Sequence, residues 1–338
     1  MKNDDDQKRF HEAIAGICPR VQQTLVNIPE KIKKEAQEIR LRAGRPVVIH
    51  TANAVCFITN DARVTDQNSN CQLIATKEDI EQSFQIICSY SIYSHQEEIR
   101  NGFVTIKGGH RVGICGTAVR QQETVNGIRD LSSLNIRIAR QINGAAKELI
   151  EALNKGKSGT LLAGPPSCGK TTLLRDIARA FSIGRMGSVK KVAVVDERGE
   201  IGGVYQGVIQ NDLGLCDILD GYPKGEGIMQ AIRSLSPDII ICDEIGNLSD
   251  LESVEEGLNA GVSIIASIHA GTLEELFRRK QALRLLNTGA FARVVMLKDR
   301  KTPGCVEKIV EVGEQGAQGN RINYTHFNGG NGRSYGVS

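Results

Sequence analysis

The sequence predicts an α/β protein in which a mostly parallel sheet carries helices on both faces, behind a smaller α+β N-terminal domain. After residue 140, short apolar segments alternate with helix-like segments, which is the pattern of buried parallel strands. A glycine-rich turn joins the first of these strands to a helix. The chain of 338 residues is 40% hydrophobic, so it is long enough to form two cores.

Residues 1–140 are expected to form the α+β domain. Residues 38–42 alternate polar and apolar side chains, as a half-buried strand does. Thr76 precedes an apolar stripe of helical spacing and provides a capping hydroxyl for a helix. The remaining expected strands are 47–49, 55–58 and the two arms of a hairpin, 103–107 and 111–115.

Residues 141–312 are expected to form the α/β domain. The expected strands of its sheet are 160–163, 192–195, 239–242 and 263–267. From residue 313 onward glycine, asparagine and glutamine dominate and apolar residues become rare, so 313–338 is expected to be a flexible tail.

The turn after the first of these strands matches the pattern G-x-x-x-x-G-K-[ST] of a nucleotide phosphate loop. Backbone N–H groups of such a loop and the positive end of the following helix face a polyphosphate. Lys170 is expected to bridge the β- and γ-phosphates of ATP, and the Thr171 hydroxyl to bind Mg²⁺. The expected nucleotide-binding residues are Gly164, Pro165, Pro166, Ser167, Cys168, Gly169, Lys170, Thr171 and Thr172.

Two later strands end in adjacent carboxylates. Asp243 and Glu244 end an apolar strand with three consecutive isoleucines, and this pattern predicts that Asp243 holds Mg²⁺ through water and that Glu244 polarises the attacking water. Glu197 follows an earlier strand, at an edge where open sheets bind ligands, although charged residues also occur at ordinary strand exits. His269 follows the next strand and is either close to the γ-phosphate or an ordinary turn residue.

Several basic residues and one cysteine are further candidates. Arg137, Arg140 and Arg233 are expected to include one arginine that acts on the nucleotide of a neighbouring subunit. Cys168 lies near a helix N-terminus, so its thiol is either reactive or directed into the core. Two basic clusters are interpreted as solvated surfaces, with a membrane or partner contact as the alternative: residues 278–280, and Lys298 with Arg300 and Lys301.

Composition restricts the partners and the location. A net charge of +3, 4% aromatic residues and no tryptophan argue against nucleic-acid binding. No apolar run approaches the roughly 20 residues that span a bilayer, and the acidic residues 4–6 differ from the basic start of a signal peptide. The protein is therefore expected to be cytoplasmic and at most peripheral to a membrane.

Together, these motifs resemble the secretion superfamily of hexameric ATPases, which drive type II and type IV secretion and type IV pili. Those motors carry a phosphate loop, an acidic "Asp box", a Walker B strand and a "His box" on a RecA-like core. The matching stretches here are 164–172, 194–200, 233–246 and 261–270. The motors usually have Glu-Asp in the Asp box and often lack the Walker B aspartate, whereas this chain has Asp196-Glu197 and Asp243-Glu244. Glu197 and Glu244 therefore both stay candidates for the catalytic base.

A narrower resemblance extends to about residue 312. The stretches 38–42, 109–113, 135–140, 217–227 and 234–238 are similar to those of the stage III sporulation protein AA family. This resemblance implies a mother-cell ATPase of the channel that joins mother cell and forespore. It also implies a hexameric ring that membrane-embedded channel proteins hold at the cytoplasmic side.

Three functions stay open at this point. The first is a hexameric secretion-type motor. The second is a nucleic-acid-dependent RecA-like ATPase, which the weak basic and aromatic patterning disfavours. The third is a nucleotide-gated assembly scaffold with little hydrolysis, which the presence of both Asp243 and Glu244 disfavours.

Overall fold

The computed structural model describes residues 2–67, 70–121, 124–153, 159–185, 187–246, 248–312, 322–326 and 333–337. The chain forms two compact units. The first unit contains residues 1–140 and 203–210, and the second contains residues 141–202 and 211–338. The chain passes from one unit to the other after Arg140, and the segment 203–210 returns to the first unit.

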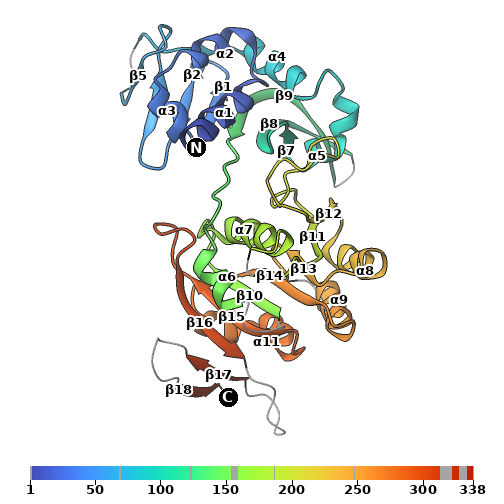
Figure 1. The fold of residues 1–338 in the computed structure, drawn as a ribbon. Coiled ribbons are helices and arrows are strands. Elements are labelled where there is room, and N and C mark those ends of the chain that lie inside the picture. Colours follow the sequence, from blue (N-terminus) through green and yellow to red (C-terminus); the bar gives the residue numbers. More distant parts are fainter. Residues whose placement is uncertain are drawn as a thin grey trace. The chain divides into compact units, whose positions relative to one another are not determined.

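The first unit contains an antiparallel seven-stranded sheet in the order β5-β4-β3-β1-β9-β8-β7 (Figure 1). Its strands are β1 (Glu38–Arg42), β3 (Val48–His50), β4 (Val55–Ile58), β5 (Val64–Thr65), β7 (Phe103–Ile106), β8 (His110–Gln121) and β9 (Thr124–Arg137). A separate pair is formed by β2 (Arg45–Pro46) and β6 (Ile74–Ala75). The helices are α1 (Lys2–Ile14), α2 (Pro19–Val26), α3 (Glu30–Glu35), α4 (Lys77–Ile87) and α5 (Gln96–Arg100).

Helix α4 begins where the sequence predicts it. The Thr76 hydroxyl accepts a hydrogen bond from the Asp79 backbone N–H, and the Asp79 carboxylate accepts one from the Thr76 N–H, which completes a capping box. The apolar stripe of the helix, with Ile80 and Phe84, joins the same core cluster as Phe10 of α1. The amphipathic helices are therefore held by burial against the sheet.

The segment 203–210 is held in the first unit by polar contacts. The Gly108 N–H donates to Oε1 of Gln210 at 2.8 Å, and the Arg9 guanidinium donates to the Gln210 carbonyl at 3.4 Å. Gly108 and Gly109 both have positive φ, which glycine adopts without strain. No sequence feature predicts this long-range pairing.

The second unit contains a nine-stranded sheet in the order β12-β11-β13-β14-β10-β15-β16-β17-β18. The first six strands in this order are mutually parallel, and β16 to β18 are antiparallel additions. The strands are β10 (Gly159–Gly164), β11 (Val192–Asp196), β12 (Asp217–Asp220), β13 (Ile239–Cys242), β14 (Ser263–His269), β15 (Phe291–Leu297), β16 (Val306–Val312), β17 (Ile322–His326) and β18 (Arg333–Val337). The helices are α6 (Lys147–Leu153), α7 (Lys170–Ser182), α8 (Lys224–Leu235), α9 (Leu248–Asn259), α10 (Leu273–Arg278) and α11 (Lys280–Asn287).

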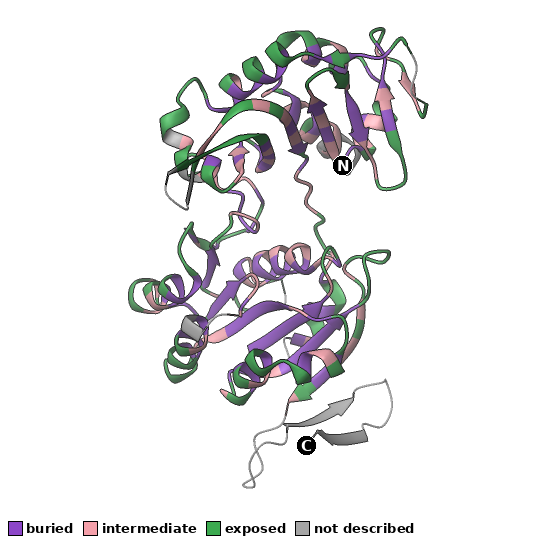
Figure 2. Ribbon diagram, turned by 180° about the vertical axis from the view of Figure 1, so that it is seen from behind, coloured by how far each residue is buried: buried purple, intermediate pink, exposed green. Residues whose placement is uncertain are grey.

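Both faces of this parallel sheet are covered (Figures 1 and 2). Leu161 and Ala163 of β10 share one core cluster with residues of α8, α10 and α11, whereas Leu162 between them faces the other way and is also fully buried. Alternate residues of a strand point to opposite faces, so the consecutive buried residues require helices on both sides. Helix α7 lies on the face opposite to α8 and α9. The predicted fold class is confirmed.

Within the segment predicted to be a flexible tail, residues 313–338, the structure places two strands. β17 pairs with β16, and β18 pairs with β17, both antiparallel. The other residues of this segment lie outside the described ones. In the part of the chain that the structure describes, no helix has both the length and the apolar character needed to cross a bilayer.

Candidate active site

The phosphate loop connects β10 to α7 and has the backbone geometry that the motif requires. Ser167 and Gly169 have φ values of +62° and +95°, so the loop turns through left-handed conformations before the helix begins at Lys170. A Cβ atom on Gly169 would lie 2.6 Å from the Gly304 nitrogen, so this position has room only for glycine. Such a turn directs successive N–H groups to one side and forms an anion site.

Lys170 lies at the mouth of this loop. Its ammonium donates to the carbonyls of Gly164 and Pro165 at 2.9 and 2.8 Å. Burial lowers the pKa of the Lys170 amine below its usual range. The Cys168 side chain, by contrast, is 0% exposed, so the structure supports the interpretation in which this thiol is directed into the core.

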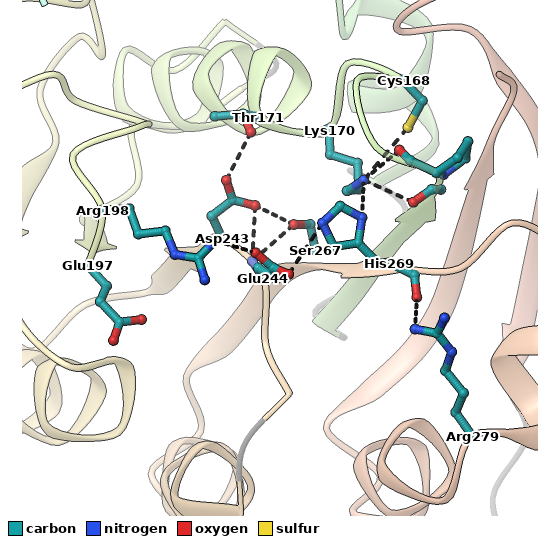
Figure 3. Close-up of polar contacts among 12 residues, drawn as sticks. Cys168, Lys170, Thr171, Glu197, Arg198, Asp243, Glu244, Ser267, His269 and Arg279 are labelled. Carbon is teal, nitrogen blue, oxygen red and sulfur yellow. Dashed lines mark hydrogen bonds and ion pairs between the residues drawn. The ribbon is translucent and has the colours of Figure 1, made fainter. Parts of the chain in front are cut away.

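His269 links Lys170 to Glu244 (Figure 3). The parallel register of β10 and β14 pairs Gly164 with His269, which places the imidazole beside the phosphate loop. Nδ1 of His269 is 3.1 Å from the Lys170 ammonium, and Nε2 is 3.3 Å from the Glu244 carboxylate. Because an ammonium only donates, Nδ1 accepts, and the proton on Nε2 points to Glu244.

Asp243 is aligned by Thr171 of α7, by Ser267 of β14 and by the residue that follows it in the chain. The Thr171 hydroxyl donates to Oδ2 of Asp243 at 2.9 Å, and Ser267 of β14 donates to Oδ1. The Glu244 N–H also donates to Oδ1 of Asp243, at 3.0 Å. β13 and β14 pair Cys242 with Ala266, so the residues that follow, Asp243 and Ser267, lie side by side.

The residues predicted to hold Mg²⁺ suit this ion. Thr171 and Asp243 present hard oxygen ligands at the edge of the phosphate loop. Magnesium needs only one or two protein ligands when phosphates and water complete its shell. Among the described residues, no group of three His, Cys, Asp or Glu side chains forms a metal site supplied by protein alone.

Glu244 has a strained backbone and two partners. Its φ of +41° is unusual for a residue with a side chain and is held by the N–H contacts to Asp243 and Ser267. Besides His269, its carboxylate accepts a hydrogen bond from Arg198 at 2.8 Å. This exposed guanidinium follows β11.

Glu197 lies apart from these contacts, although it follows the neighbouring strand. Its carboxylate forms an ion pair with Lys224 at the start of α8, and no dashed line joins it to Glu244 in Figure 3. A small cavity still contains both carboxylates in its lining. The lining residues are Asp196, Glu197, Arg198, Glu200, Lys224, Asp243 and Glu244.

Asp196, the last residue of β11, shapes the loop beyond it. This carboxylate is 1% exposed and accepts hydrogen bonds from the N–H groups of Glu200, Ile201 and Gly202. Burial raises the pKa of Asp196 above its usual range despite these bonds. The contacts define a structural role for Asp196 at the entrance of the segment 203–210.

The three predicted arginines have different surroundings. Arg140 donates to the carbonyls of Ala36 and Lys33 and pairs with Asp6, all in the first unit. Arg137 ends β9 in the same unit and is exposed. Arg233 lies on α8 in the second unit and lines a cavity beside α8 and α9.

Sequence reasoning missed four residues that contact the predicted ones: Arg198, Lys224, Ser267 and Arg279. Ser267 could have been found, because it lies two residues before His269 and therefore on the same face of β14. Arg279 donates to the His269 carbonyl at 2.5 Å from a position ten residues later. Lys224 gives no local sequence signal, because its partner Glu197 is distant in the chain.

Comparisons with known proteins agree with this geometry. The chain is similar to solved structures of the pilus retraction motor PilT with bound ADP (13% identity, 82% of this chain and 76% of that chain, TM-score 0.53). It is also similar to the ATPase DotB from Legionella pneumophila (14% identity, 82% of this chain and 74% of that chain, TM-score 0.51). At these identities the likeness concerns the fold alone. It confirms the expected RecA-like fold of the second unit, preceded in the chain by a separate N-terminal domain.

Sequence comparison is more specific. The chain is 39% identical over 302 residues to "Stage III sporulation protein AA" of Bacillus subtilis strain 168, which covers 88% of this chain and 94% of that protein. The family model "Sporulation stage III, protein AA" matches residues 7–318. This chain therefore belongs to the sporulation stage III, protein AA family.

Proposed function

We propose that this protein binds ATP with Mg²⁺ at the phosphate loop and hydrolyses it. The observation that carries the proposal is the contact series Lys170–His269–Glu244 at the carboxyl edge of the sheet, with the pair Thr171–Asp243 beside it. The similar solved structures support it, because they are described as an ATPase and as a motor with bound ADP.

Each residue has a defined task in this proposal. The loop N–H groups and Lys170 bind the phosphates, and Lys170 exchanges its contacts with the Gly164 and Pro165 carbonyls for phosphate oxygens. Thr171 and Asp243 would hold Mg²⁺, and the ion would supply positive charge beside the phosphates.

We assign Glu244 as the base that accepts a proton from the attacking water. His269 holds this carboxylate from one side and Arg198 from the other, so it is oriented toward the phosphate loop. Glu197 is the alternative base, and its ion pair with Lys224 argues for a structural role.

The wider role rests on family membership. We propose that the protein is the mother-cell ATPase of the sporulation channel between mother cell and forespore, and that it acts as a hexameric ring at the cytoplasmic side of membrane-embedded channel proteins. An arginine from one subunit completes the site of the next. DNA leaves the turnover rate unchanged.

The test compares two matched substitutions. Glu244→Gln and Glu197→Gln each remove one negative charge from a strand end. Glu244→Gln is expected to bind ATP with the wild-type affinity and to lose turnover by roughly 100-fold or more, whereas Glu197→Gln retains most of it. ATP affinity and phosphate release are measured for both variants. An active Glu244→Gln with an inactive Glu197→Gln would reverse the assignment of the base.

A further inference from the structure

The loop between β15 and β16 carries cations that the proposed function does not use. Lys298, Arg300 and Lys301 are exposed, and within the described chain none has a hydrogen-bond or ion-pair partner for its side chain. The acidic residue among them, Asp299, accepts hydrogen bonds from the Lys301 N–H at 2.9 Å and the Thr302 hydroxyl at 3.4 Å. Its carboxylate therefore shapes the loop, and among the described residues it forms no ion pair with Lys298, Arg300 or Lys301.

This loop, residues 298–305, lies against the phosphate loop. The Gly304 N–H donates to the Cys168 carbonyl at 2.8 Å. A Cβ on Gly169 would meet the backbone of Gly304 and Pro303 at 2.6 and 3.3 Å, so the two loops are in backbone contact. The parallel register pairs Ala163 with Met296, so residues 298–305 begin level with the phosphate loop.

The order of the strands places opposite charges on the two sides of the phosphate loop. β14 and β13 lie on one side of β10 and contribute His269, Asp243 and Glu244, whereas β15 lies on the other side and leads into residues 298–305. Attack on the terminal phosphate is assigned to the carboxylate side. With that assignment, the side of residues 298–305 is the one left for the remaining phosphates and the nucleoside.

We propose that residues 298–305 form a second wall of the nucleotide site, in which Lys298, Arg300 and Lys301 bind the phosphates of the nucleoside-diphosphate part. The inference rests on the proposed function, because it extends the same site. These cations increase the affinity for ADP and for ATP equally, since both nucleotides contain the nucleoside-diphosphate part. Flexible lysine and arginine side chains suit this task, because they can follow a phosphate without a preformed cavity.

The test removes the three charges together and compares two matched variants. The first is Lys298→Ala/Arg300→Ala/Lys301→Ala. The control is Arg185→Ala/Lys190→Ala/Lys191→Ala, which removes equal charge between α7 and β11. These residues precede the amino end of β11, whereas the phosphate loop follows the carboxyl end of β10. Equilibrium dissociation constants for ADP and ATP are measured with fluorescent nucleotides at two salt concentrations.

The first variant is expected to bind both nucleotides about tenfold more weakly, since each exposed pair contributes up to about fivefold, and to lose part of the salt dependence. The control is expected to bind like the wild type. Equal affinity of the first variant and the control overturns the inference and leaves the proposed function standing. A wild-type protein that binds neither nucleotide overturns both.

A second measurement leaves the cations in place. Cys71, Cys115 and Cys305 are the exposed cysteines, and Cys305 lies in the proposed wall. In a Cys71→Ser/Cys115→Ser background, maleimide labels Cys305, and ADP is expected to slow this labelling several-fold. An unchanged rate at saturating ADP contradicts the proposed wall.

Discussion

At the scale of single residues, the geometry of the site depends on side chains that neighbouring strands supply. Asp243 is oriented by Ser267 and Thr171, and Glu244 by His269 and Arg198. A carboxylate with fixed hydrogen-bond donors is already oriented before substrate binds, which lowers the cost of reaching the transition state.

Ser267 provides a test of this orientation. Ser267→Ala removes the hydroxyl that donates to Asp243 and accepts from the Glu244 N–H, so turnover is expected to fall by about tenfold or more. The nucleotide affinity should change little, because Lys170 and the loop backbone stay in place. Ser263→Ala, at the start of the same strand, is the control. An equal loss of turnover in both variants would show that a disturbance of β14, and not the missing Ser267 hydroxyl, causes the effect.

The buried thiol of Cys168 gives a second prediction at this scale. Alkylating reagents are expected to label Cys71, Cys115 and Cys305 in the native protein and to reach Cys168 only after unfolding, because its side chain is 0% exposed. Mass spectrometry of peptides from the labelled protein measures this. Rapid labelling of native Cys168 that ATP prevents would show instead that the thiol faces the nucleotide.

At the scale of elements, the sequence predicted those parts in which local chemistry decides the structure. The phosphate loop needs glycine at Gly169, and helix α4 needs Thr76 and Asp79, so each leaves a short signature. The buried strand β13 is recognisable from its three isoleucines and places Asp243 at an edge of the sheet.

Other elements depend on contacts that are distant in the chain. Gln210 contacts Gly108, and Lys224 contacts Glu197, although no local pattern marks either pair. The strand β8 extends far beyond the predicted arm at 111–115 and pairs with β9. The sequence pattern did not predict this extension, because exposed residues such as Thr117 and Arg120 lack apolar alternation. The tertiary fold brings these residues together, and a single sequence does not encode such distant contacts locally.

The strand β8 begins at a histidine whose titration should be measurable. His110 accepts a hydrogen bond from the Ala139 N–H at 3.0 Å, and this contact holds the chain as it leaves β9. Burial, followed by the charges of Arg9 and Arg140, lowers the pKa of His110 from 6.5 to about 3. The folded protein therefore keeps this imidazole neutral.

Between those two pKa values the unfolded chain binds a proton that the folded chain does not. The free energy of unfolding should therefore decrease as the pH falls below about 6.5, by about 1.4 kcal/mol per pH unit from this group. Urea unfolding at pH 7, 6 and 5 should show a steeper loss for the wild type than for His110→Gln. Parallel losses in the two proteins would exclude His110 as the source.

At the scale of the whole molecule, the proposed ring distinguishes the three predicted arginines. Arg140 is engaged by the carbonyls of Ala36 and Lys33, so Arg140→Ala is expected to destabilise the first unit. The exposed residues Arg137 and Arg233 are the remaining candidates for action on a neighbouring subunit.

Mixing two inactive proteins tests this expectation. Arg137→Ala or Arg233→Ala should abolish turnover and keep nucleotide affinity, and mixing the inactive variant with Glu244→Gln should restore part of the activity. Some interfaces would then combine an intact arginine with an intact glutamate. No recovery in mixtures that form mixed rings, verified by mass measurement, would refute action between subunits.

The central claim is that Lys170 and the surrounding loop bind ATP for hydrolysis at this edge of the sheet. Its most direct test is the measurement of ATP binding and phosphate release for the wild type and for Lys170→Ala. The wild type should bind ATP in the presence of Mg²⁺ and release phosphate, whereas Lys170→Ala should do neither, because the phosphates lose their buried counter-charge. A wild type that binds no ATP, or a Lys170→Ala variant that releases phosphate at the wild-type rate, would contradict the claim.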